Sequence, residues 1–121
     1  MQRVNGIGGF FFRAKDPEAL AAWYAKYLGV DPVPTGPGQE AWTQQAGTTA
    51  FAPFSHDSDY FGKSSQQWML NFRVDDLDAM VAQLQAGGIE VKVDPEVTDF
   101  GRFARLHDPE GNPIELWQAP S

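Results

Sequence analysis

The chain has 121 residues, a formal net charge of −7 and no cysteine. This length allows one compact domain or two very small modules that share a core, and the 42% apolar content is enough to form that core. The negative charge argues against nucleic acid or an anionic membrane surface as a partner. Disulfides and thiolate metal sites are excluded, and the sequence has no secretory signal pattern or long apolar run, so we expect a cytoplasmic protein.

The first expected element in chain order is a Phe-rich strand over residues 7–14. A helix should follow it, because Asp16 suits the N-cap and Pro17 suits the first helical position, where its missing N–H costs nothing. The apolar spacing carries this helix to about Leu28, and Gly29 is a typical helix stop.

A Pro- and Gly-rich stretch over residues 31–38 leads from this helix to the next expected elements. Residues 41–45 and 48–54 are predicted to form a hairpin around Gly47. The polar, Ser-rich residues 56–66 are predicted to be a linker or loop.

The second half of the sequence predicts a strand, a helix and three further strand-like segments. Asp76 is the expected cap of the helix, and the residues Asp108–Asn112 suit a tight turn between the last two strands. The predicted ranges are 68–74 for the strand, 77–86 for the helix, 89–93 for a short strand, and 102–106 with 114–118 for the closing hairpin.

Part of the sequence is repeated about sixty residues further on. Residues 9–16 align with residues 69–76 without a gap, so that the Phe-Arg pair and the capping Asp of one segment match those of the other. The pattern predicts the order βαβββ twice, an α+β fold in which the helices cover one face of a largely antiparallel sheet.

Three segments, residues 15–29, 72–78 and 108–117, resemble the glyoxalase/bleomycin-resistance/extradiol-dioxygenase superfamily, also called vicinal oxygen chelate proteins. The resemblance covers essentially the whole chain. It implies a single glyoxalase-like domain over residues 1–121, in which two βαβββ modules form half-open barrels around a cavity, each with a helix on its outside. Module one would span about 1–55, the linker about 56–66 and module two about 67–121. The resemblance also implies a homodimer and, in many members, a divalent metal held by His, Gln or Glu.

The positions that would hold this metal are mostly without suitable donors. The resemblance places Gly9 and Met69 at two of them, and glycine has no side chain while a thioether is a poor ligand for hard or borderline ions. Glu115 is the remaining oxygen donor, and one carboxylate holds a divalent ion weakly. We therefore expect no cofactor, although a divalent metal bound through other ligands stays open.

Strand alternation predicts which side chains share a face with Glu115, the candidate catalytic residue. These mixed aromatic and polar side chains would line the cavity, and the opposite, apolar sets would pack under the helices. Without a metal, Glu115 should accept a hydrogen bond or an ion pair from a neighbouring Arg or Asn, or be protonated. The candidate ligand-binding residues are Phe11, Arg13, Met69, Asn71, Arg73, Phe103, Arg105 and Trp117.

Two hypotheses about function follow. The first is a protein that binds a small organic molecule in the barrel cavity without chemistry, with a degenerate metal site. The second is a metal-dependent glyoxalase-like lyase or isomerase, or a dioxygenase, that uses Glu115 as ligand or base. Both predict a small-molecule ligand and self-association as the partners, with no nucleic acid and no membrane.

Overall fold

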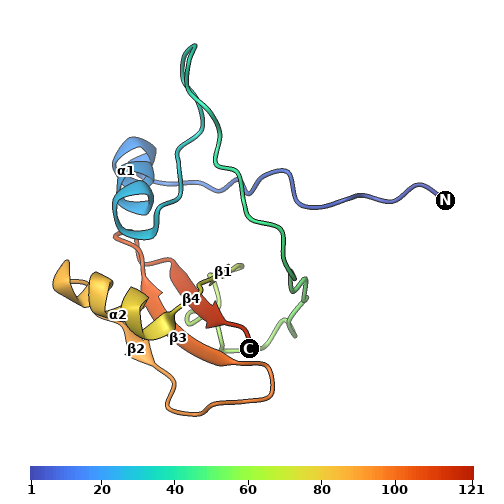
Figure 1. The fold of residues 1–121 in the computed structure, drawn as a ribbon, viewed down its shortest axis with the longest axis vertical. Helices are drawn as coiled ribbons and strands as arrows, with labels where there is room; N and C mark the ends of the chain where they lie inside the picture. Colours follow the sequence, from blue (N-terminus) through green and yellow to red (C-terminus); the bar gives the residue numbers. More distant parts are fainter.

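In the computed structural model, which describes residues 1–121, two helices and a four-stranded sheet form an α+β fold (Figure 1). The sheet order is β1-β4-β3-β2, in which β1 runs parallel to β4 and the other neighbours are antiparallel. The elements are α1 (Pro17–Leu28), β1 (Leu70–Arg73), α2 (Leu77–Ala86), β2 (Lys92–Val93), β3 (Arg102–His107) and β4 (Pro113–Gln118).

Both helices begin and end as their sequences predict. The Asp16 carboxylate accepts a hydrogen bond from Ala19 N at 3.1 Å, and the Asp76 carboxylate accepts one from Ala79 N at 3.0 Å. Gly29 ends α1 in the left-handed conformation at φ 72°, which a glycine adopts without steric cost. The helical part of the predicted repeat is therefore confirmed.

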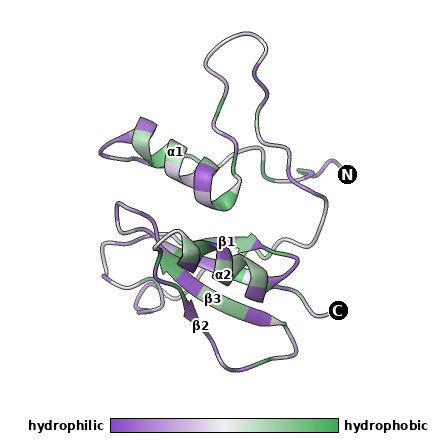
Figure 2. Ribbon diagram, turned by 60° about the vertical axis from the view of Figure 1, so that its left-hand side comes forward, coloured by the Kyte–Doolittle hydropathy of each residue, from purple (hydrophilic) through white to green (hydrophobic).

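The core lies between α2 and one face of the sheet. Figures 1 and 2 show α2 against the sheet and α1 further from it. Burial of these apolar side chains is the main favourable term that holds the layers together. The buried residues are Leu20 and Tyr24 of α1, Leu77, Val81 and Leu84 of α2, and Ala104, Leu106, Ile114 and Leu116 of the sheet.

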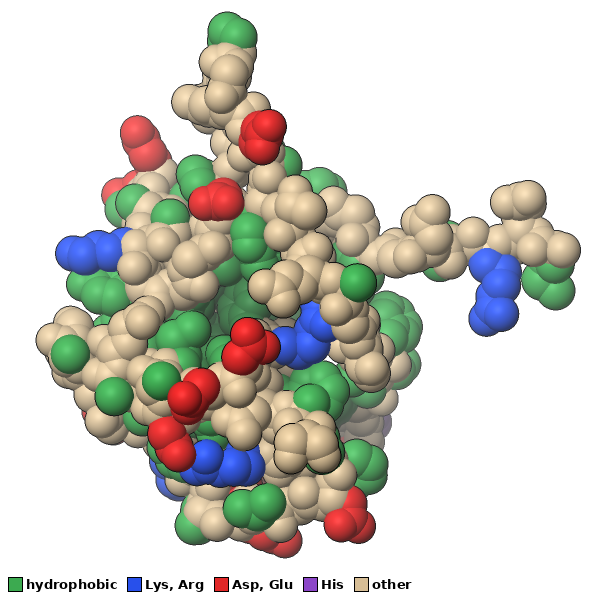
Figure 3. Space-filling model, viewed as in Figure 1, with side chains coloured by type: hydrophobic (Ala, Val, Ile, Leu, Met, Phe, Trp, Pro, Cys, Tyr) green, Lys and Arg blue, Asp and Glu red, His purple; other side chains and the backbone are tan.

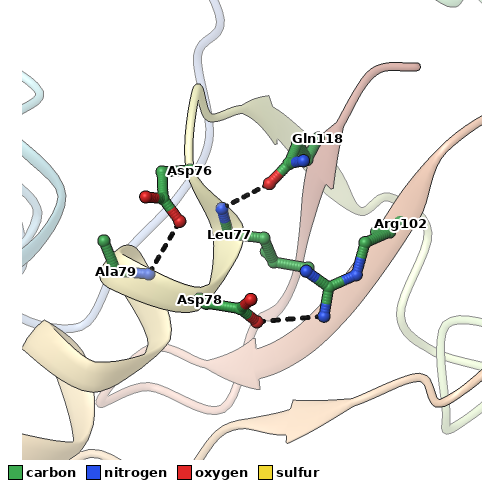
Figure 4. A network of polar contacts seen from close by, with 6 residues as sticks. All are labelled: Asp76, Leu77, Asp78, Ala79, Arg102 and Gln118. Carbon is green, nitrogen blue, oxygen red and sulfur yellow. Dashed lines mark hydrogen bonds and ion pairs between the residues drawn. The ribbon is translucent and has the colours of Figure 1, made fainter. Parts of the chain in front are cut away.

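Polar contacts fix the start of α2 on the sheet (Figure 4). The Leu77 amide donates to the Gln118 side-chain oxygen of β4 at 2.7 Å, and Arg102 of β3 pairs with Asp78 at 3.0 Å. The hydrogen bond and charge of Arg102 lower the pKa of the Asp78 carboxyl below its ordinary value. These contacts join the first turn of α2 to β4 and β3.

Helix α1 is held instead by the turn between β3 and β4. The Tyr24 hydroxyl donates to Asp108 Oδ2 at 2.7 Å, and burial together with this hydrogen bond raises the pKa of Tyr24. The Glu110 carboxylate accepts hydrogen bonds from the backbone amides of Lys15 and Asp16, at 2.7 and 3.0 Å. This turn, at the far end of the sequence, therefore supports the first helix.

The strands predicted in the first half of the chain are not formed. Residues 7–14, 41–45 and 48–54 have no regular secondary structure. The free end of the N-terminal arm (residues 1–16) and the loop after α1 project from the body (Figures 1 and 3). A strand needs a neighbour to satisfy its backbone groups, and these segments have none in the single chain. The Phe12 ring instead packs against Tyr24 and Trp68. The two-module barrel thus stays a prediction.

Candidate functional site

A row of polar side chains crosses the face of the sheet opposite α2. Asn71 of β1 is aligned with Glu115 of β4, Glu115 with Arg105 of β3, and Arg105 with Lys92 of β2. Residues paired across neighbouring strands point to the same face, so an amide, a carboxylate and two cations form one line. The alternation predicted for β1, β3 and β4 is confirmed here.

Glu115 lies at the centre of this row and is only 8% exposed. Its Oε1 accepts a hydrogen bond from Asn71 Nδ2 at 2.7 Å, and its Oε2 accepts one from the Tyr60 hydroxyl. A buried carboxylate needs such donors, and the amide and the phenol supply them in place of an arginine. Of the donors considered from sequence, Asn71 is the one that forms the bond.

Tyr60 connects this carboxylate to the cation beside it. Its ring lies 4.5 Å from the Arg105 guanidinium carbon, a cation–π distance, and the Phe54 ring stacks on it with centroids 5.7 Å apart. Burial and the hydrogen bond to Glu115 raise the pKa of Tyr60 to about 12. The phenol therefore keeps its proton at neutral pH and remains a hydrogen-bond donor.

Tyr60 belongs to a segment, Ser55–Gln66, that we call the strap. Three successive turns shape it, with backbone hydrogen bonds from Ser58 to Ser55, from Gly62 to Asp59 and from Gln66 to Lys63, at 2.9 to 3.0 Å. Gly62 has φ 95°, which favours glycine at the end of the second turn. These turns bring Tyr60 over the polar row.

A cavity of about 990 Å³ lies beside the strap, β2 and β3. Its walls combine aromatic rings with charged groups of both signs, and it is broadly open to solvent. Its lining residues are Trp23, Asp59, Tyr60, Gly62, Ile89, Glu90, Lys92, Asp94, Pro95, Phe103, Arg105, Leu106, His107, Asp108 and Pro109.

The donors at the metal position of vicinal oxygen chelate proteins do not fit a divalent ion in this chain. Gly9 offers no side chain and Met69 offers a thioether, while both Glu115 oxygens already accept hydrogen bonds from Asn71 and Tyr60. No cluster of three or more His, Asp or Glu side chains that could hold a metal occurs elsewhere in the structure.

Most of the residues predicted for the site lie on the face of the sheet that carries Glu115. Phe103 and Arg73 are both aligned with Trp117, and Asn71 and Arg105 flank Glu115. Two of these side chains make contacts that the sequence did not indicate. Arg73 donates to the Gln45 carbonyl at 2.9 Å, and Trp117 Nε1 donates to the Phe100 carbonyl at 2.7 Å.

The structure does not bring the other three predicted residues to this row. Phe11, which is 93% exposed, and Arg13 lie in the N-terminal arm, outside the sheet. Met69 lines a second cavity of about 390 Å³ together with strap residues and with residues directly before and after the strap. Phe11 and Arg13 were expected to share a face with Glu115 as part of a strand, which the arm does not form. Met69 directly precedes β1, so the pairing of β1 with β4 does not place its side chain.

Two residues of the site were missed by the sequence analysis. Lys92 lies in a two-residue strand, too short for alternation to place its side chain. Tyr60 lies in a segment that was read as a polar linker, although a Tyr-Phe-Gly triplet among serines and aspartates was a signal that part of this loop packs on the body.

The model of the family described as "Glyoxalase-like domain" matches residues 9–117. The chain therefore belongs to the glyoxalase-like domain family, and its structural neighbours are consistent with the vicinal oxygen chelate superfamily. No curated protein sequence matches. None of the helices is long and apolar enough to cross a membrane.

Solved structures resemble the chain over nearly its whole length. TnmS3, described as an antibiotic binding protein from Streptomyces sp. CB03234, is 29% identical with a TM-score of 0.66, and the match covers 99% of this chain and 100% of that one. A lactoylglutathione lyase from Agrobacterium tumefaciens is 21% identical with a TM-score of 0.62, covering 97% of this chain and 96% of that one. A putative glyoxalase family protein from Bacillus anthracis is 20% identical with a TM-score of 0.57, covering 98% and 100%. The last two likenesses bear on the fold alone.

Proposed function

We propose that this protein binds a small organic molecule in the cavity beside the strap and carries out no chemistry on it. The observation that carries the proposal is the cavity itself, with aromatic walls from Trp23, Tyr60 and Phe103 next to the polar row. The likeness to TnmS3, an antibiotic binding protein that matches over the whole chain, supports the same class of function.

We propose further that binding needs no divalent metal. The possible metal ligands support this proposal. Glu115 is the one strong ligand at the metal position of the family, and its two oxygens accept hydrogen bonds from Asn71 and Tyr60. The alternative function, a metal-dependent lyase or isomerase, would require further protein ligands beside Glu115. The structure has no group of three or more His, Asp or Glu side chains that would supply them.

We also propose a homodimer in which the first-module segments pair as strands and complete the two-module barrel. Large apolar side chains are exposed in these segments, with Phe11 at 93% and Phe51 at 84%. Strand β1 has a partner on one edge only, so backbone donors and acceptors are free on the other. Association would bury both features, and sedimentation at micromolar concentration should find a dimer. A monomer under these conditions contradicts the proposal.

The binding proposal is tested by titrating purified protein with a panel of polycyclic aromatic antibiotics, with and without a chelator, and following thermal unfolding and calorimetric heat. At least one compound should raise the melting temperature, because a ligand that binds only the folded state stabilises it. The chelator should make no difference, and Phe103→Ala should weaken binding because it removes an aromatic wall.

Elemental analysis of protein purified without chelator completes this test. Glu115→Gln is compared with Glu40→Gln, an equivalent change at an exposed position of the loop after α1 that lines neither cavity. Stoichiometric metal in the unmodified protein that is lost in Glu115→Gln and retained in Glu40→Gln would contradict the metal-free proposal and favour the lyase.

A further inference from the structure

One hydrogen bond joins the strap to the sheet, and it runs from the Tyr60 hydroxyl to Glu115 of β4. The other hydrogen bonds of the strap are made within it or to the residues that directly follow it. Tyr60 is nevertheless 38% exposed and forms part of the cavity wall. The Tyr60 phenol, on a segment outside the sheet ladder, therefore contacts both Glu115 and the cavity.

The groups that contact Tyr60 form a binding site for a phenol. The Glu115 carboxylate accepts from its hydroxyl, Asn71 holds the other carboxylate oxygen, and the Arg105 guanidinium lies over the face of its ring. A hydrogen bond to a carboxylate is stronger than one between neutral groups, and a cation over a ring adds to it. Each of these contacts is available to any aromatic ring with a hydroxyl group.

The charges along the row restrict which ligands fit there. An anionic group in the place of the Tyr60 hydroxyl would be repelled by Glu115, which is nearly buried. A cationic ring in the place of the Tyr60 ring would be repelled by the Arg105 guanidinium, whose carbon lies 4.5 Å from the centroid of that ring. A neutral group that donates a hydrogen bond meets neither repulsion.

We propose that Tyr60 occupies the place of the ligand's phenol: the ligand is a planar aromatic compound with a phenolic hydroxyl, which replaces the Tyr60 hydroxyl at Glu115 and lies beneath Arg105. This inference rests on the proposed binding function and names the chemical class of its ligand. On binding, the Tyr60 side chain leaves Glu115 and the strap loses its hydrogen bond to the sheet. The cavity beside Tyr60 provides the space from which the ligand enters.

The test uses three probes of nearly equal size: 2-naphthol, 2-methoxynaphthalene and naphthalene-2-carboxylate. Calorimetry on the unmodified protein should give 2-naphthol an affinity about tenfold or more above the other two, because only the phenol donates to Glu115. Glu115→Gln should reduce this preference. The comparison of probes needs no variant, so it does not depend on how a substitution affects folding.

The displacement is tested with Tyr60→Phe, and Tyr27→Phe is the matched control because it removes a hydroxyl outside the cavity. Tyr60→Phe should raise the affinities for 2-naphthol and its methyl ether together, by about tenfold, since the internal competitor for Glu115 is gone. The ratio between the two probes should stay the same, and Tyr27→Phe should leave both affinities unchanged.

Three outcomes contradict the inference in different ways. Weaker binding by Tyr60→Phe means that Tyr60 contacts the ligand and is not replaced by it. Equal affinity for the three probes removes the phenol as the ligand class while the binding function stands. If neither the naphthalene probes nor the antibiotic panel binds, the proposed function fails, and the inference fails with it.

Discussion

Helices α1 and α2 begin alike, with an aspartate cap at matching repeat positions, but their surroundings differ. Helix α2 follows a strand that pairs in the sheet and lies on that sheet, with Leu77 and Leu84 fully buried. Helix α1 follows an arm without strand structure, and it is held by Tyr24 and by the turn at Asp108 and Glu110.

The two halves of the chain show which structure depends on residues close in sequence and which depends on residues far apart in sequence. A helix cap needs a side chain and a backbone amide three residues later, so both halves form it from the same residues. A strand needs a second strand at hydrogen-bonding distance. Residues 70–73 find one in β4, whereas residues 10–13 find none within the chain.

The largest expected effect comes from the centre of the sheet. Leu116→Ala should lower the free energy of unfolding by about 2 to 5 kcal/mol, because Leu116 is fully buried and its loss leaves a cavity. Val33→Ala, at an exposed position in the first half, should change it by less than about 0.5 kcal/mol. Urea unfolding measures both, and similar values would mean that the first half is as well packed as the second.

A smaller effect is expected at Tyr24, whose hydroxyl joins α1 to the turn between β3 and β4. Tyr24→Phe should cost about 1 to 3 kcal/mol, because it removes a buried hydrogen bond to the Asp108 carboxylate, which then keeps its bonds from Glu110 N, Asn112 N and Asn112 Nδ2. Tyr27→Phe serves as the control on the same helix. Thermal unfolding of the two variants gives the difference, and equal melting temperatures would show that α1 does not depend on this bond.

The smallest effects compare the two caps directly. Asp16→Ala and Asp76→Ala should each cost about 1 kcal/mol, since each leaves one amide of the first helical turn without its acceptor. Asp16→Asn and Asp76→Asn retain a capping oxygen and should be nearly neutral. Chemical denaturation of the four variants makes the comparison, and a cost at Asp76 alone would indicate that α1 is not part of the cooperative unit.

The sequence predicted the elements that depend on neighbours in the chain. The bounds of both helices are confirmed because Asp16, Asp76 and Gly29 act within one turn, and the hairpin of β3 and β4 is confirmed because residues 108–112 form its turn. The strands predicted at 7–14, 41–45 and 48–54 are not formed in the single chain, since alternation describes the faces of a strand but does not supply its partner.

The site was predictable to the same extent. Alternation placed Asn71, Arg105 and Glu115 on one face because their strands pair in register. It could not place Tyr60, whose position depends on three turns of the strap and not on a repeating pattern. From the sequence, an arginine or an asparagine was expected as the partner of Glu115, and the structure has Asn71 together with the Tyr60 phenol.

The order of strands in the sheet has a consequence for synthesis on the ribosome. β1 pairs only with β4, so residues 70–73 have no neighbour until residues 113–118 have been made. The Glu110 carboxylate that supports the start of α1 also emerges late, well after the helix itself. From the synthesis of residues 70–73 until that of residues 113–118, a nascent chain would therefore carry an unpaired β1 segment, and the sheet would be completed only late in synthesis.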